Sequence, residues 1–222
     1  MSFSPVKTMK SAQVRRLIRI SLTDPHIVAV SLLFSAVLFA ANQQATLYDI
    51  QNPRWVLSMG LLILLSPIAH SFILIRVHAL LNQGSVPVLK RGLAASAAFY
   101  PRLVAGEILV SLVTAAGMFL LLLPGIYIGL RLSFYKQEIV LAGKPLIAAL
   151  RASMVRTRSW STLGLIFLIL APIYGIEVLV GYIAGSVAAG IGGVIMAIFA
   201  AAIGFSLMNV FITAVYLESE TQ

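Results

Sequence analysis

The chain has 222 residues, of which 60% are apolar and only 10% are charged, and its mean hydropathy is +1.00. A soluble domain is roughly 45–50% apolar and about 25% charged, so these few charges cannot cover the apolar surface in water. The chain has no cysteine, which also excludes disulfide scaffolds, thiolate nucleophiles and cysteine metal sites. The composition predicts an all-α protein embedded in lipid.

Uncharged apolar stretches predict one membrane domain over residues 1–222 with six transmembrane helices. A span needs about 20 apolar residues, and two stretches are long enough to be divided. The first divides at Pro124-Gly125, because proline can open a helix and glycine allows a tight reversal. The second divides near residues 190–193. The predicted spans are 25–41, 55–81, 101–123, 124–141, 160–187 and 191–216.

The distribution of positive charge predicts the topology. With the N-terminus inside, fourteen of the 16 lysines and arginines lie on the cytoplasmic side, Arg54 lies outside and Arg131 is embedded. Cations in short loops mark the cytoplasmic side, so we expect both termini in the cytoplasm. This topology explains the net charge of +9 without nucleic acid. The basic region before the first span is longer than that of a signal peptide, so we expect the span to be retained.

Two basic amphipathic helices are predicted on the cytoplasmic side, over residues 5–22 and 144–158. After the first of them, Thr23 or Asp24 caps the next helix, with Pro25 at its first position. The apolar side of the first helix is expected to lie in the lipid headgroups.

In the second basic segment, three cations seven residues apart share one edge of a helix: Lys144, Arg151 and Arg158. Beside them runs a predicted apolar stripe of Leu146, Ile147, Leu150 and Met154. One interpretation is an interfacial helix bound to anionic lipid headgroups. The other is a docking surface for an acidic partner or a lipid phosphate, and periodicity does not separate the two interpretations.

Three segments resemble a family signature: residues 123–135 (LPGIYIGLRLSFY), 139–143 (IVLAG) and 148–153 (AALRAS). The pattern resembles the YciC-like family of uncharacterised bacterial inner-membrane proteins. More loosely, it is similar to the membrane domain of glycerophosphodiester phosphodiesterases. Ala142 and Met154 depart from it, where relatives often carry an acidic and an aromatic residue. The resemblance implies a six-span protein of the bacterial inner (plasma) membrane, with a role in envelope or lipid homeostasis and no catalytic residue to transfer.

The residues give little sign of chemistry. Phosphodiester hydrolysis usually needs a metal held by several carboxylates or histidines, whereas the seven acids and three histidines here are scattered along the chain. There is no serine triad, dinucleotide loop or phosphate loop. We therefore expect no enzyme, no cofactor and no metal site.

Two ionisable residues inside the predicted membrane region are the best candidates for a polar site. Glu107 is expected about 9 Å, and Arg131 about 15 Å, from the cytoplasmic side. They lie on adjacent antiparallel spans, so an arginine side chain can bridge the difference. The sequence leaves open a structural ion pair or a proton- or ion-coupled site.

Small residues at four-residue intervals in the last two spans predict close packing between these spans or a homodimer face: Gly181, Gly185, Ala189 and Gly193. The sequence thus predicts a non-catalytic accessory or scaffolding protein that meets anionic headgroups, a membrane-protein partner or a second copy. The alternative is a small transporter or lipid-handling protein with a polar site around Glu107 and Arg131.

Overall fold

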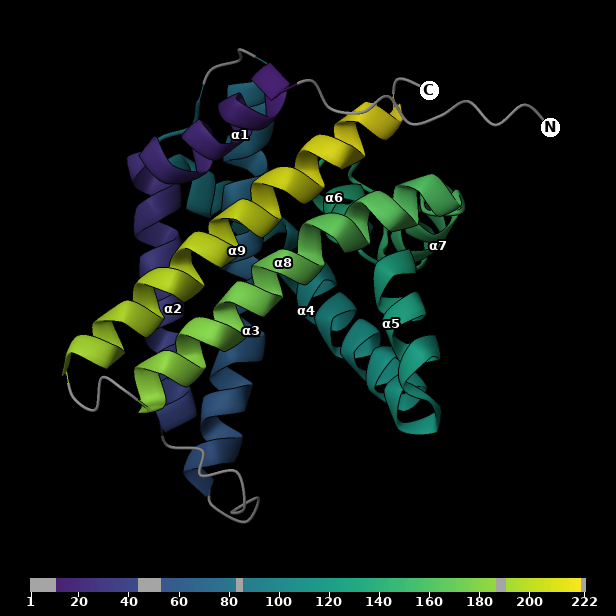
Figure 1. Ribbon diagram of the computed structural model, residues 1–222. Helices are drawn as coiled ribbons and strands as arrows, with labels where there is room; N and C mark the ends of the chain where they lie inside the picture. Colours follow the sequence, from purple (N-terminus) through teal and green to yellow (C-terminus); the bar gives the residue numbers. More distant parts are fainter. Residues whose placement is uncertain (1–10, 44–52, 83–85, 187–190, 221–222) are drawn as a thin grey trace.

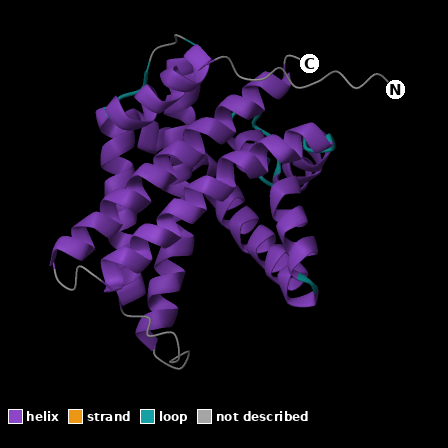
Figure 2. Cartoon of the chain, in the orientation of Figure 1, coloured by secondary structure: helices purple, strands orange, loops and turns teal. Residues whose placement is uncertain are grey.

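The computed structural model describes residues 11–43, 53–82, 86–186 and 191–220, and within these ranges the chain forms helices and short connections without strands (Figure 2). The prediction of an all-α protein is confirmed for this part of the chain. The helices are α1 (Ser11–Thr23), α2 (Pro25–Gln43), α3 (Pro53–Leu81), α4 (Leu89–Leu120), α5 (Leu122–Arg131), α6 (Tyr135–Val140), α7 (Leu146–Arg156), α8 (Trp160–Ser186) and α9 (Ile191–Glu220).

The long helices pack around α3 and α9, which contact each other and most of their neighbours. In Figure 1, α1, α6, α7 and the end of α9 lie toward one end of the molecule, and the connection between α4 and α5 lies at the other. One core cluster joins α1, α2, α3 and α9 around Phe72, Ile73 and Val77. A second joins α3, α4, α6 and α7 around Leu74, Leu103 and Ile139.

Four helices of the described part are long and apolar enough to cross a membrane: 63–81, 89–120, 160–180 and 192–219. A fifth crossing exists only if α1 and α2, which are bent by 64° at Asp24, form one broken span. Large apolar side chains face outward along these helices, and Phe119 at the α4–α5 connection is 94% exposed. Such helices are consistent with a membrane protein, in which lipid covers this surface.

The connection between the third and fourth predicted spans differs from the prediction. Helix α4 begins at Leu89, continues through Pro101 and ends at Leu120, and extended Leu121 breaks the chain. Pro124 and Gly125 lie in the first turn of α5 rather than at the reversal. A Cβ on Gly125 would lie 2.5 Å from the Met118 nitrogen. The glycine is therefore needed for close approach of α4 and α5, and not for the turn.

The predicted span 124–141 is not one helix. α5 ends at Arg131, residues 132–134 form a turn, and α6 contains only Tyr135–Val140. At 1.5 Å per residue, the ten residues of α5 extend about 15 Å, which is half of the hydrocarbon thickness of a bilayer.

The first basic helix also differs from its prediction. Residues 5–10 lie outside the described residues, and α1 begins at Ser11. Leu17 is 3% exposed and belongs to the core cluster of α2, α3 and α9, and Ile20 packs against it. Part of the apolar side of α1 therefore contacts protein instead of headgroups. Arg16 donates a hydrogen bond of 3.1 Å to the Leu80 carbonyl, which ties α1 to the end of α3.

Candidate functional site

A polar cluster connects α3, α4 and α6 among the apolar helices. Lys136 Nζ lies 2.6 Å from Glu107 Oε1, and the two side chains are 17% and 19% exposed. The Ser66 hydroxyl donates to the same carboxylate oxygen at 3.0 Å. Because a charge in hydrocarbon is costly unless it is paired, each group stabilises the other in the charged form.

Histidine and asparagine extend this cluster to α9. His70 Nδ1 lies 2.7 Å from Asn209 Oδ1, and the Asn209 amide donates to the Phe205 carbonyl at 2.7 Å. His70 interacts electrostatically with both Glu107 and Lys136. Four helices thus contribute polar groups to one region, although each group has a partner of its own.

The predicted ion pair between Glu107 and Arg131 is wrong. The Arg131 side chain points to α7, where Nη1 donates to the Thr157 carbonyl at 2.7 Å. Thr157 is the C-terminal cap of α7, so Arg131 satisfies a carbonyl that the helix leaves unpaired. The partner of Glu107 is Lys136, which the charge count assigned to the cytoplasmic side.

The break between α5 and α6 is held by hydroxyl groups of α7. The Arg131 carbonyl accepts hydrogen bonds from Ser153 Oγ at 3.0 Å and from Thr157 Oγ1 at 2.9 Å. The Phe134 N–H donates to Ser153 Oγ at 3.1 Å. Unpaired backbone groups are costly at membrane depth, so these hydroxyls make the interruption tolerable.

A buried carboxylate links α6 to α7 and to the turn between them. Glu138 of α6 is fully buried and forms ion pairs with Arg156 of α7 and, at 2.7 Å, with Lys144 Nζ. The Arg156 guanidinium also lies over the Tyr216 ring of α9, 4.6 Å from its centroid. Gly143, with a φ of +67°, allows the tight turn between α6 and α7. The short helix α7 is thereby bound to both α6 and α9.

The predicted apolar stripe of α7 is divided between two faces. Ala149 and Ser153 are buried, and Leu146 and Leu150 are half-buried in the core. Ile147 and Met154 face outward instead, and Ile147 is 64% exposed. The prediction fails for Ile147 and Met154 because the face of α7 that packs on the bundle is centred on Ala149 and Ser153, with Leu146 and Leu150 beside them.

The three predicted basic residues of this segment have different positions. Arg151 and Arg158 are exposed, whereas Lys144 pairs with Glu138. Lys144 and Arg158 lie just outside α7, which spans Leu146–Arg156. Arg151 shares the outward face with Ile147 and Met154, since the three lie within about 60° around the helix axis.

Another ion pair lies at the junction of α1 and α2. Asp24 caps α2, as predicted, by accepting from the N–H groups of His26 and Ile27 at 3.1 and 3.0 Å. Arg76 donates to both Asp24 oxygens, at 2.7 and 2.9 Å, and to the Pro87 carbonyl at 2.6 Å. Burial raises the pKa of the Asp24 carboxyl, but Arg76 and the two N–H groups lower it, and the pKa is below its ordinary value.

Within the described residues, no three histidine or acidic side chains come together where a metal ion could bind. The long apolar helices and their paired charges define an all-helical protein consistent with a membrane location. Comparison of the chain with family models, curated proteins and solved structures gives no match. The function is therefore argued from the residues alone.

Proposed function

We propose that this protein is a non-catalytic accessory protein of a bacterial inner membrane, in which α7 forms a fixed basic surface that binds anionic lipid headgroups. The observation that carries the proposal is the outward face of α7. There Arg151 lies beside Ile147 and Met154, which are large apolar side chains exposed to the surroundings. A role in envelope or lipid homeostasis is part of this proposal.

Cations beside apolar side chains are typical of a helix that lies in the membrane interface. Each basic residue near an anionic surface contributes about 1 kcal/mol to binding. The ion pairs of Glu138 and the hydrogen bonds of Ser153 hold α7 against the bundle. Because α7 is already held in place, it loses little conformational entropy when it binds a membrane, which favours headgroup binding.

The absence of cysteine from the chain makes a single-cysteine labelling experiment direct. Met154→Cys protein is placed in nanodiscs of phosphatidylcholine, with or without phosphatidylglycerol, and treated with a water-soluble maleimide. We expect phosphatidylglycerol to slow labelling about tenfold, because Arg151 and Arg158 together contribute about 2 kcal/mol at most. Replacing both arginines by glutamine removes the difference.

Asn82→Cys is the matched control, since Asn82 is exposed just after α3 and should label equally in both lipids. Equal labelling of Met154→Cys in both lipids contradicts headgroup binding. Protection that appears only when another protein is added supports the acidic partner instead and also contradicts the proposal.

The same proposal includes six crossings with both termini in the cytoplasm, in which the interrupted α5–α6 segment forms the fourth crossing. Leu121, exposed at the α4–α5 connection, is then on the outer side and Asn82 on the inner side. In intact cells, an impermeant maleimide should label Leu121→Cys at once and Asn82→Cys only after lysis. Labelling of both before lysis contradicts this topology.

A transporter or lipid-handling protein is the second candidate, because Glu107, Lys136 and His70 bring ionisable groups from three helices together. The accessory role has more support, since Glu107 pairs with Lys136 and His70 pairs with Asn209. In proteoliposomes containing a pH-sensitive dye, we expect no proton flux above that of empty vesicles. A flux that disappears in an equally stable Glu107→Gln/Lys136→Met variant supports the transporter and contradicts the accessory role.

A further inference from the structure

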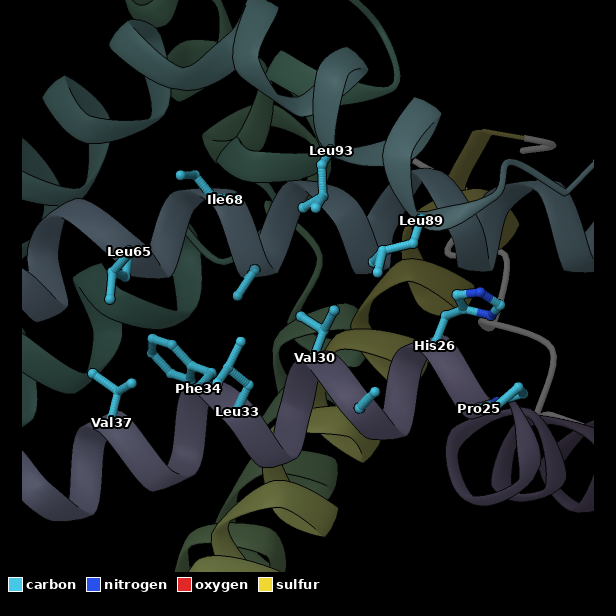
Figure 3. A pocket seen from close by; sticks show the side chains of 12 residues that line it. Pro25, His26, Val30, Leu33, Phe34, Val37, Leu65, Ile68, Leu89 and Leu93 are labelled. Atoms are coloured by element: carbon cyan, nitrogen blue, oxygen red, sulfur yellow. The ribbon is translucent and has the colours of Figure 1, made fainter.

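An apolar groove of about 540 Å³ runs between α2 and α3 and ends under the start of α4 (Figure 3). On α2 its lining extends from Pro25 to Val37, which is about 18 Å along the helix. This length is close to the depth of one leaflet, half of a hydrocarbon core of about 30 Å. On the opposite side, Leu65 of α3 points toward α2 (Figure 3), and Ile68 and Ala69 of the same helix complete the lining.

One arginine fixes the shape of the groove mouth. Arg76 binds Asp24, which precedes α2, and the carbonyl of Pro87, which precedes α4. The starts of α2 and α4 are thereby held at a fixed distance from each other, with Pro25 and Leu89 on either side of the opening. The mouth is a built feature of the fold, tied by a nearly buried ion pair.

The mouth holds His26, the one polar residue among those that line the groove. The buried Nδ1 of its imidazole has no hydrogen-bond partner among the described residues. Lys90 and Arg91, both exposed, follow Leu89 on α4 at about 100° and 200° around the helix axis, so Lys90 is the cation beside the mouth and Arg91 lies on the far side of the helix. A phosphate at the mouth would meet Lys90 and the imidazole, while an acyl chain attached to it would lie along α2.

We propose that this groove binds one acyl chain of an anionic phospholipid, with the lipid phosphate at His26 and Lys90. The leaflet-length apolar lining fits the chain, and the positive charge at one end fits the headgroup. This site is separate from the outward face of α7 and does not depend on it. It makes the protein selective for anionic lipid at a defined position, beyond general attraction to a charged membrane.

The test counts lipid that stays with the protein. Detergent-purified full-length protein is washed free of lipid, incubated with equal amounts of phosphatidylglycerol and phosphatidylcholine, and washed again, and retained lipid is measured by mass spectrometry. We expect about one phosphatidylglycerol per chain, retained about tenfold over phosphatidylcholine. Ala29→Phe, which fills the groove, should abolish retention. Ala105→Phe, an equal change at an exposed position of α4 outside the lining, should not.

A Lys90→Gln variant separates headgroup from chain. It should retain lipid but lose most of the tenfold preference, whereas Arg102→Gln, at another exposed position of α4, keeps it. Equal retention by wild type and Ala29→Phe overturns the proposal. So does wild-type protein that retains no lipid, or retains both lipids equally. Self-association that Ala29→Phe abolishes, without lipid retention in wild type, assigns the groove to a second copy and also overturns it.

Discussion

Removing one charge of the Glu107–Lys136 pair should destabilise the protein, whereas removing both charges should cost much less. Glu107→Gln leaves the Lys136 ammonium, and Lys136→Met leaves the carboxylate with Ser66 alone. A lone charge costs roughly 2.5–3.5 kcal/mol on membrane-insertion scales. Because both side chains are about one fifth exposed, we take the lower value, about 2.5 kcal/mol. In a chain of this size, that lowers Tm by about 5–10 °C.

The double variant Glu107→Gln/Lys136→Met should recover to within about 1 kcal/mol of wild type, or about 2–4 °C, since it contains no unpaired charge. The assay is thermal unfolding in mild detergent at constant lipid content. Arg131→Leu provides the matched control, because Arg131 contacts Thr157 and not Glu107. Combined with Glu107→Gln, it should give additive losses. Recovery with Arg131→Leu, or its absence with Lys136→Met, would refute the pairing.

Three further variants probe other parts of the structure. Ser153→Ala removes the hydroxyl that bridges the α5–α6 break and should cost about 1–3 kcal/mol in thermal unfolding, whereas Ser159→Ala should cost little. Gly125→Ala should destabilise by about 1–3 kcal/mol through the clash with α4, unlike Gly164→Ala, which has open space. The pKa of Asp24 is lowered in the fold, so its ionised carboxylate stabilises the protein above about pH 4, and this stabilisation is lost as the pH falls further. Asp24→Asn should therefore reduce the loss of stability with decreasing pH in this range.

Each of these has a clear contrary result. If Ser153→Ala is as stable as Ser159→Ala, the hydroxyl does not support the break. If Gly125→Ala matches Gly164→Ala, α4 and α5 are not in close contact. An Asp24→Asn variant whose stability falls with acid as steeply as wild type shows that another carboxyl group controls this range.

The helical class follows from composition, and the Asp24 cap follows from Asp-Pro before an apolar run. The depth estimate that pairs Glu107 with Arg131 favours Lys136 when it is applied to that residue as well. Lys136 lies five residues before Leu141, about 7.5 Å from the cytoplasmic side, which is closer to the depth of Glu107 than Arg131 is. The positive-charge count does not reveal this pairing, because a lysine near the end of a predicted span is assigned to the adjoining loop.

The face of α7 that packs on the bundle could not be found from hydropathy. Ala149, Ser153 and Thr157 recur every four residues and share one side of the helix, but none of them is strongly apolar. Ser153 and Thr157 are buried against the backbone groups of Arg131 and Phe134, which need partners because α5 ends early. The hydropathy pattern of α7 alone therefore does not reveal that its hydroxyl groups bind backbone groups about twenty residues earlier in the chain.

The hydrogen bonds from α7 also impose an order on biogenesis. The Arg131 carbonyl and the Phe134 N–H are synthesised before Ser153 and Thr157, which later pair with them. Each such group costs several kcal/mol if it enters hydrocarbon alone. In the proposed topology, where the α5–α6 segment is the fourth crossing, we expect this connection to stay near water until α7 emerges and residues 122–157 to be integrated as one unit. A nascent chain arrested before Ser153 should expose this connection to quality-control proteases.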